Sequence, residues 1–182
     1  MDPQTKARTY WGRYAYPDWL REHSLLVGRI AATLVATRNA IGDRLDADAV
    51  TLAAYLHDIG RSPLLMGDPR EHNELSAFVL AAEGLADCVE PARRHAIYTV
   101  LDPATAPRTM ADKVVYVADR RGGMTVESIE ERAKDTARRH PRYASQIERA
   151  VPLAKEIEHQ VFAGLPFGPG ELASRITHEA TQ

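Results

Sequence analysis

Apolar residues in this chain recur three and four positions apart, which is the spacing of one face of an α-helix rather than of a strand. The pattern is clear at Leu26, Val27, Ile30, Ala31 and Leu34. Alanine, leucine, glutamate and arginine are abundant, and aromatic residues make up only 7% of the chain. Because these frequent residues favour helices, we expect an all-α fold.

Length and charge narrow the class of protein further. The 182 residues, 45% hydrophobic and 26% charged, are typical of one globular domain, so we expect a single domain over 1–182. With 23 basic and 25 acidic residues, the net charge of −2 favours neither nucleic acid nor an anionic membrane as a partner. The sequence leaves open whether the protein forms a homodimer.

The N-terminal sequence and cysteine content indicate a soluble cytoplasmic protein. The polar N-terminus lacks a signal sequence, and the apolar run 77–82 is far shorter than the ~18 residues of a membrane helix. A lone cysteine, Cys88, rules out an intramolecular disulfide and a paired-cysteine metal site, and it fits a reducing compartment.

Prolines, glycines and capping residues set the expected helix boundaries. The loop 62–71 has a length that often carries function. The expected helices are 18–37, 47–57 with Asp46 as its N-cap, 72–83, 87–98, 109–120, one within 125–140, 143–162, and a short one in the tail.

Four aromatic residues, Trp11, Tyr14, Tyr16 and Trp19, fall close together before and at the start of the first expected helix. We expect them to cover the hydrophobic end of the bundle. The alternative is that they stack on a purine base.

Histidines and aspartates with metal-ligand chemistry occur at helix ends or on apolar helix faces. Imidazole and carboxylate groups bind divalent ions such as zinc, iron, manganese or cobalt. A single buried histidine is more often a hydrogen-bonded core residue, but the ordered placement of the whole group on separate helices indicates one shared site. The group consists of His23, His57, Asp58, His72, His95 and Asp119. By contrast, His140, His159 and His178 lie in charged sequence and are expected at the surface.

This ordered pattern resembles the HD-domain superfamily of metal-dependent phosphohydrolases. The matching residues are His23, LHDIG (56–60), His72, His95 and VAD (117–119), within about 18–123. The size and the REHNELSA segment (70–77) are most similar to the small bacterial dinuclear branch that splits symmetrical diadenosine tetraphosphate. The AIYTV segment after His95 departs from the His-Thr-Thr-Gly-like sequence of that branch.

The resemblance implies a dinuclear metal site in which Asp58 bridges the two ions and is catalytic. It implies one ion on His23, His57, Asp58 and Asp119, and a second on His72, His95 and the other oxygen of Asp58. A water activated by these ions would attack phosphorus. Iron is the first expectation for the metal, with manganese, cobalt, zinc, nickel and magnesium as alternatives.

Three arginines are candidates for contacting substrate phosphate. Arg61 directly follows LHDIG, where many relatives carry lysine, and we expect it to hold a phosphate during catalysis. The alternative for Arg61 is a surface residue after a helix cap. Arg120 and Arg121 follow Asp119 and are expected to line the same opening.

The sequence therefore predicts an enzyme, a metal-dependent phosphohydrolase acting on a small nucleotide or another phosphate-containing substrate. Symmetrical diadenosine tetraphosphate hydrolysis is the first specific expectation. One alternative is a di-iron oxygenase, because such members of the same superfamily have nearly the same ligands. Another is a regulatory HD module without turnover, against which the intact ligand set argues.

Overall fold

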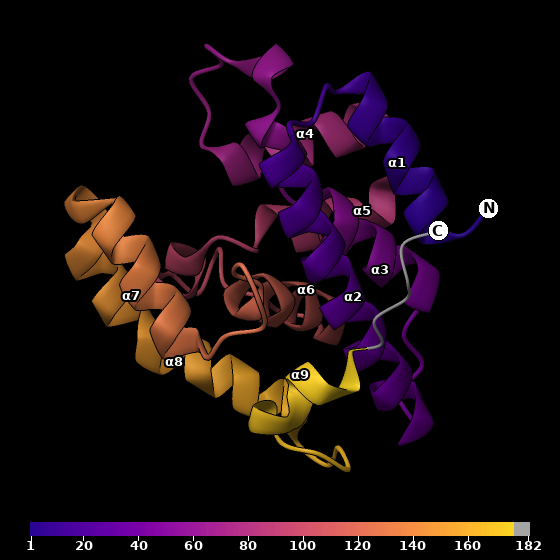
Figure 1. Cartoon of the computed structure of the whole chain (residues 1–182), viewed down its shortest axis with the longest axis vertical. Helices are drawn as coiled ribbons and strands as arrows, with labels where there is room; N and C mark the ends of the chain where they lie inside the picture. The colour runs from indigo at the N-terminus through magenta and orange to yellow at the C-terminus, as the bar shows by residue number, and fades with distance from the viewer. Residues whose placement is uncertain (177–182) are drawn as a thin grey trace.

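The computed structural model of the protein describes residues 1–176, and these residues form α-helices joined by short 3-10 turns (Figure 1). They contain no strand, only an isolated bridge between Gly122 and Val126. The predicted all-α fold is therefore confirmed. The α-helices are α1 (Pro3–Arg13), α2 (Asp18–Ala40), α3 (Ala47–Leu56), α4 (His72–Ala82), α5 (Ala86–Arg93), α6 (Met110–Arg121), α7 (Ile129–Arg139), α8 (Ala144–Phe162) and α9 (Leu172–Arg175).

The 3-10 turns lie between the α-helices, and three of them flank segments that carry candidate site residues. They are η1 (Ile59–Arg61), η2 (Pro63–Leu65), η3 (Ile97–Leu101), η4 (Pro141–Tyr143) and η5 (Pro169–Glu171). Among the described helices, none combines the length and the apolar character that crossing a membrane requires.

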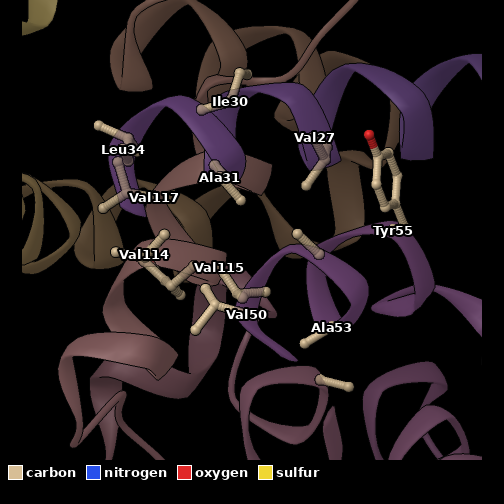
Figure 2. Packing of buried hydrophobic residues seen from close by; sticks show 14 of the residues in the cluster. Val27, Ile30, Ala31, Leu34, Val50, Ala53, Tyr55, Val114, Val115 and Val117 are labelled. Atoms are coloured by element: carbon tan, nitrogen blue, oxygen red, sulfur yellow. The ribbon is translucent and has the colours of Figure 1, made fainter. Parts of the chain in front are cut away.

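The core lies where α2, α3 and α6 meet (Figure 2). All residues of α3 from 50 to 56 are buried, as expected for the central helix. Burying one large apolar side chain contributes about 1.5–3 kcal/mol, so the end of α3 is firmly held. The labelled residues in this region are Val27, Ile30, Ala31, Leu34, Val50, Ala53, Tyr55, Val114, Val115 and Val117.

A glycine allows α2 and α3 to approach closely. A Cβ at Gly28 would lie 2.1 Å from Cε1 of Tyr55, so only glycine leaves room for this ring. On its other side Tyr55 meets Trp11 edge to face at 5.9 Å between ring centroids, and Trp11 Nε1 donates to the Tyr55 carbonyl at 3.1 Å. These contacts fasten α1 to α3.

The N-terminal segment differs in part from expectation. It forms α1, a helix that the sequence analysis did not predict, although Asp2 caps it by accepting from Thr5 N at 2.9 Å. Trp11 and Tyr16 are buried and stack on each other, which confirms that they cover the bundle. Trp19 is 56% exposed, so it does not take part in that cover.

The fourth predicted helix ends earlier than expected. It was predicted to reach residue 98, but α5 ends at Arg93 and the chain forms η3 instead. The cause is tertiary: the Arg94 guanidinium donates to the carbonyls of Ala104 and Ala106, while the Thr99 hydroxyl donates to the Arg94 carbonyl at 2.8 Å. These bonds take the place of the helical backbone hydrogen bonds that would continue α5 past residue 95.

The C-terminal helices α7 and α8 lie side by side along one edge of the molecule, and both pack against α6 (Figure 1). Capping determines where α7 begins, because the Ser128 side chain accepts from Glu131 N and the Glu131 carboxylate accepts from Ser128 N. The short helix expected in the tail is α9.

Candidate metal centre

The histidines and aspartates singled out in the sequence come together from separate helices. His23 belongs to α2, His72 is the first residue of α4, and Asp119 lies on the last turn of α6. His57 and Asp58 follow the end of α3, and His95 follows α5. One position within α2 and the ends of α3, α4, α5 and α6 thus bring all six side chains together.

Three of these side chains form a first ligand set. His23 Nε2 lies 3.3 Å from His57 Nε2 and 3.2 Å from Asp119 Oδ1, and His57 Nε2 lies 3.6 Å from the same oxygen. Ligand atoms bound about 2.0–2.2 Å from one metal ion lie roughly 3–3.5 Å apart. The spacing of this set therefore suits a shared divalent ion, as the chemistry of its donors does.

A second ligand set lies beside the first. His72 Nε2 is 3.2 Å from His95 Nε2, and Asp58 Oδ1 is 3.7 Å from His72 Nε2 and 3.2 Å from His95 Nε2. The His57 and His95 rings are in edge-to-face contact at 4.8 Å, so the two sets are neighbours.

Asp58 is the residue that the two sets share. Its Oδ2 faces the first set, 3.9 Å from His23 Nε2 and 3.7 Å from His57 Nε2. Its Oδ1 faces His72 and His95. A carboxylate with one oxygen toward each set has the arrangement required of a bridging ligand.

Backbone carbonyls orient the two most deeply buried imidazoles. His57 Nδ1 lies 2.7 Å from the Ala54 carbonyl, and His95 Nδ1 lies 2.5 Å from the Ala92 carbonyl. A carbonyl only accepts hydrogen bonds, so each Nδ1 carries a proton and each Nε2 offers its lone pair to the centre. This tautomer is the one that a metal-binding histidine needs.

The surroundings favour the metal-binding charge state at four of these side chains and oppose it at His57, whose pKa Asp58 and Asp119 raise against the effect of burial. Burial lowers the pKa of His72 to about 3 and also lowers the pKa of His95, so both rings are neutral. Burial opposes ionisation of Asp58 and Asp119, but Arg61 and His57 hold the pKa of Asp58 well below its usual range. Arg120 and His57 do the same for the pKa of Asp119. Neutral imidazoles and ionised carboxylates are the forms that bind metal.

Gly60 lets the turn after α3 lie directly against α4. A Cβ at this position would lie 2.3 Å from the His72 carbonyl oxygen and 2.8 Å from Ser76 N. Gly60 N also donates to Ser76 Oγ at 2.9 Å. This close contact fixes the start of α4, and with it His72, relative to Asp58.

Sequence reasoning missed a second positioning contact. Asn73 is buried, accepts from the Tyr98 hydroxyl at 2.6 Å and donates to the Arg93 carbonyl at 2.6 Å. It thereby ties the start of α4, which carries His72, to the segment that carries His95. In the sequence Asn73 is visible only as a polar residue beside His72, and this position does not show that its partners are Arg93 and Tyr98.

Arg61 contacts the second ligand set. Its Nε donates to Asp58 Oδ1 at 2.9 Å and its Nη2 lies 3.1 Å from His72 Nε2, while 42% of the side chain remains exposed. The expected residue is thus at the centre and reaches solvent. Its guanidinium donates to Asp58 Oδ1 and His72 Nε2, and a second ion would need the lone pairs of these same atoms.

The two arginines after Asp119 have different surroundings. Arg120 is buried and forms an ion pair with Asp119 Oδ2, which leaves Oδ1 facing the histidines. Arg121 instead pairs with Glu158 on α8 at 2.6 Å and donates to the Pro169 carbonyl at 2.8 Å. Successive residues of a helix point about 100° apart, so Arg121 does not line the opening as expected.

The remaining histidines stand outside the centre. His140 and His159 are exposed, as predicted for surface residues, and His178 lies outside the described residues. In the part of the chain that the structure describes, the groups with metal-ligand spacing include His23 with His57 and Asp119, and His57 with Asp58 and His95, to which His72 adds its contacts with Asp58 and His95.

Fold and site together define a helical bundle with a buried histidine and aspartate centre suited to divalent metal. The family model of the HD domain matches residues 20–124, which is more than half of the chain. The protein therefore belongs to the HD-domain family, whose members are generally metal-dependent hydrolases that bind divalent ions. No curated protein and no solved structure matches the chain.

Proposed function

We propose that this protein is a phosphohydrolase that uses two divalent metal ions to cleave a nucleotide phosphoanhydride or phosphoester bond. The observation that carries the proposal is the position of Asp58. One of its oxygens faces His23 and His57, and the other faces His72 and His95. A closed structural zinc site holds one ion with four ligands, so it does not require a carboxylate shared between two ligand sets.

The side chains have separate roles in this proposal. His23, His57 and Asp119 would hold one ion, His72 and His95 the other, and Asp58 both. Bound ions would supply an activated water and stabilise the negative charge that develops on the phosphoryl and leaving-group oxygens. Arg61, partly exposed at the second ligand set, would exchange its bonds to Asp58 and His72 for bonds to a substrate phosphate.

The first specific substrate that we propose is symmetrical diadenosine tetraphosphate, with iron as the first metal. The REHNELSA segment supports this choice, because it supplies His72 to the second ligand set. Four imidazole donors and two carboxylates suit iron, and also manganese, cobalt, zinc and nickel.

The test starts with metal analysis of protein purified without added metal. It continues with an anaerobic screen of nucleotides, diadenosine tetraphosphate among them, in which released phosphate and nucleotide products are measured. We expect up to two ions per chain and metal-dependent hydrolysis of at least one nucleotide. Oxygen uptake by the iron-loaded protein without hydrolysis in the screen would instead support an oxygenase, and metal binding without either reaction a regulatory module.

Replacing Asp58 tests the observation that carries the proposal. Asp58→Ala should abolish turnover and leave the helical content unchanged. Asp48→Ala is the matched control, because Asp48 is an exposed carboxylate in the first turn of α3, the helix that precedes Asp58. Retention of more than about a tenth of wild-type activity in Asp58→Ala, equivalent to a loss below ~1.4 kcal/mol, would contradict the bridging role.

A further inference from the structure

Arg120 carries a buried hydrogen-bond donor that its ion pair does not use. The guanidinium binds Asp119 Oδ2 through Nη2, and the residue as a whole is 8% exposed. Its Nε is fully buried and has no hydrogen-bond partner among the described residues. Buried donors are nearly always paired, so this N–H indicates an acceptor that residues 1–176 do not provide.

Two more arginines share this feature: Arg121, which already bonds Glu158 and the Pro169 carbonyl, and Arg132, on α7. The Arg132 side chain is 15% exposed, and its Nε is buried without a partner among residues 1–176. Its ion-pair contact is with Asp135 at 3.8 Å, but that carboxylate already pairs with Arg138 and Arg139 at 2.8 Å each. Three arginines therefore share one carboxylate, and positive charge is in excess on this part of α7.

The two arginines lie on neighbouring helices, because α6 and α7 pack together. Their charges also interact: burial lowers the pKa of Arg132, the Asp119 carboxylate raises it, and the charge of Arg120 lowers it again. Two positive charges on packed helices, each with an unpaired Nε donor, make an environment that an anion stabilises.

Phosphate is the anion that fits this pair. A guanidinium presents its N–H groups in a plane and binds phosphate oxygens through two parallel bonds. Asp119, itself a member of the first ligand set, lies between Arg120 and the histidines of that set, since its Oδ2 faces Arg120 and its Oδ1 faces His23 and His57. A phosphate on the arginines would therefore not be the one that reacts.

We propose that Arg120 and Arg132 form a subsite for a second, non-reacting phosphate, so that the substrate is a nucleoside or dinucleoside polyphosphate rather than a monophosphate. This inference rests on the proposed function. Arg132 lies beyond residues 20–124, so the match to the HD domain does not include it.

The test compares Arg132→Gln with Arg138→Gln. Arg138 is the matched control because it lies on the same helix, also pairs with Asp135, and has an 81% exposed side chain. Binding of inorganic tripolyphosphate to the full chain as purified is measured by calorimetry, with metal content determined on the same samples. We expect Arg132→Gln to weaken binding about tenfold or more, since it removes a charge-assisted hydrogen bond, and Arg138→Gln to leave it unchanged.

Kinetics separate this inference from the proposed function. Arg132→Gln should raise KM for a nucleoside polyphosphate and leave kcat/KM for bis(p-nitrophenyl) phosphate, a single phosphate, unchanged. Weaker tripolyphosphate binding without hydrolysis of any nucleotide would keep the subsite and overturn the proposed function. Hydrolysis with wild-type binding and KM in Arg132→Gln would keep the function and overturn the subsite.

Arg132→Lys keeps the test decisive should the glutamine variant unfold. It retains the charge but loses the planar fork, so we expect tripolyphosphate affinity between those of wild type and Arg132→Gln. Wild-type affinity in Arg132→Lys, together with an unfolded glutamine variant, would assign Arg132 a purely structural role and overturn the subsite. Failure of the wild-type protein to bind tripolyphosphate would overturn it as well.

Discussion

Arg61 Nε lies 2.9 Å from Asp58 Oδ1, the carboxylate oxygen that also faces His72 and His95. Arg61 Nη2 lies 3.1 Å from His72 Nε2. The guanidinium thus bonds to two of the atoms that would bind a second ion. No comparable cation bonds to the Nε2 atoms of the first set among the described hydrogen bonds. The two ligand sets are therefore not equivalent.

This difference predicts that Arg61→Ala binds the second ion more tightly. The substitution removes two competing hydrogen bonds and a positive charge close to the site, so we expect an affinity gain of about tenfold or more. The first ion should bind as in wild type. Calorimetric titration of metal-depleted protein with manganese or cobalt measures both affinities. Loss of the second ion in Arg61→Ala would show that Arg61 supports the second set instead of competing for it.

The same variant should be a poorer enzyme. If Arg61 holds a substrate phosphate, kcat/KM of Arg61→Ala falls by the equivalent of ~1.5–3 kcal/mol. Arg61→Lys should recover part of that loss, because lysine restores the positive charge but not the planar guanidinium that binds phosphate through two hydrogen bonds. Arg70→Ala is the control, since Arg70 is an exposed arginine of the loop that follows Arg61, where it pairs with Asp68. Unchanged steady-state kinetics in Arg61→Ala would remove the phosphate role.

Replacing His72 and His95 together should remove one of the two ions and leave the other bound. We expect the double alanine variant to bind one ion instead of two, because the first set of His23, His57 and Asp119 does not include either side chain. Metal analysis of the variant after saturation and removal of free metal gives the stoichiometry. A wild-type protein that never exceeds one ion per chain at saturation would show that the assignment of two ions is wrong.

The helical fold and the meeting of the six metal-ligand side chains could be predicted from the sequence. Helical periodicity reports which face of a helix is buried, and each of these residues lies on such a face or at the end of a buried helix. The structure places them together, as at His57 and Asp119, whose Nε2 and Oδ1 lie 3.6 Å apart. Metal binding itself stays a prediction.

Other features depend on contacts that no local pattern encodes. Arg120 and Arg121 are adjacent in sequence, but the phase of α6 directs one toward Asp119 and the other toward Glu158. Arg120 and Arg132 lie on separate helices, α6 and α7, whose packing against each other no local pattern shows. The end of α5 at Arg93 follows from bonds between the Arg94 side chain and a loop ten residues on. The capped start of α1 at Asp2 was a local signal, and it was overlooked.

The thiol of Cys88 should react slowly in the folded protein. Cys88 is buried against α3, and burial raises the pKa of its thiol to about 12. At pH 8 the thiolate fraction is then about a thousandfold lower than for a thiol with an ordinary pKa. The rate of modification by a disulfide reagent should rise about tenfold per pH unit between pH 7 and 9, and guanidinium should abolish the protection. Fast modification of the native protein that levels off near pH 8.5 would contradict this burial.

Gly60→Ala should damage the second ligand set more than the first. The new Cβ would lie 2.3 Å from the His72 carbonyl oxygen and 2.8 Å from Ser76 N, and both of these atoms belong to the backbone of α4. Backbone cannot rotate away as a side chain does, so either the turn η1 or the start of α4 must shift. Such overpacking typically costs about 1–3 kcal/mol, and the shift would displace His72 from Asp58.

The comparison variant is Gly12→Ala, because a Cβ at Gly12, in α1, meets no atom within 4 Å. Alanine there should leave stability unchanged or raise it by up to about 1 kcal/mol, since it favours the helix. Urea unfolding gives the stability of both variants, and metal titration gives the affinities of the two ions. We expect Gly60→Ala to lower the unfolding midpoint and weaken the second ion, with the first ion affected less. Wild-type stability and two tightly bound ions in Gly60→Ala would show that the contact between η1 and α4 does not position His72.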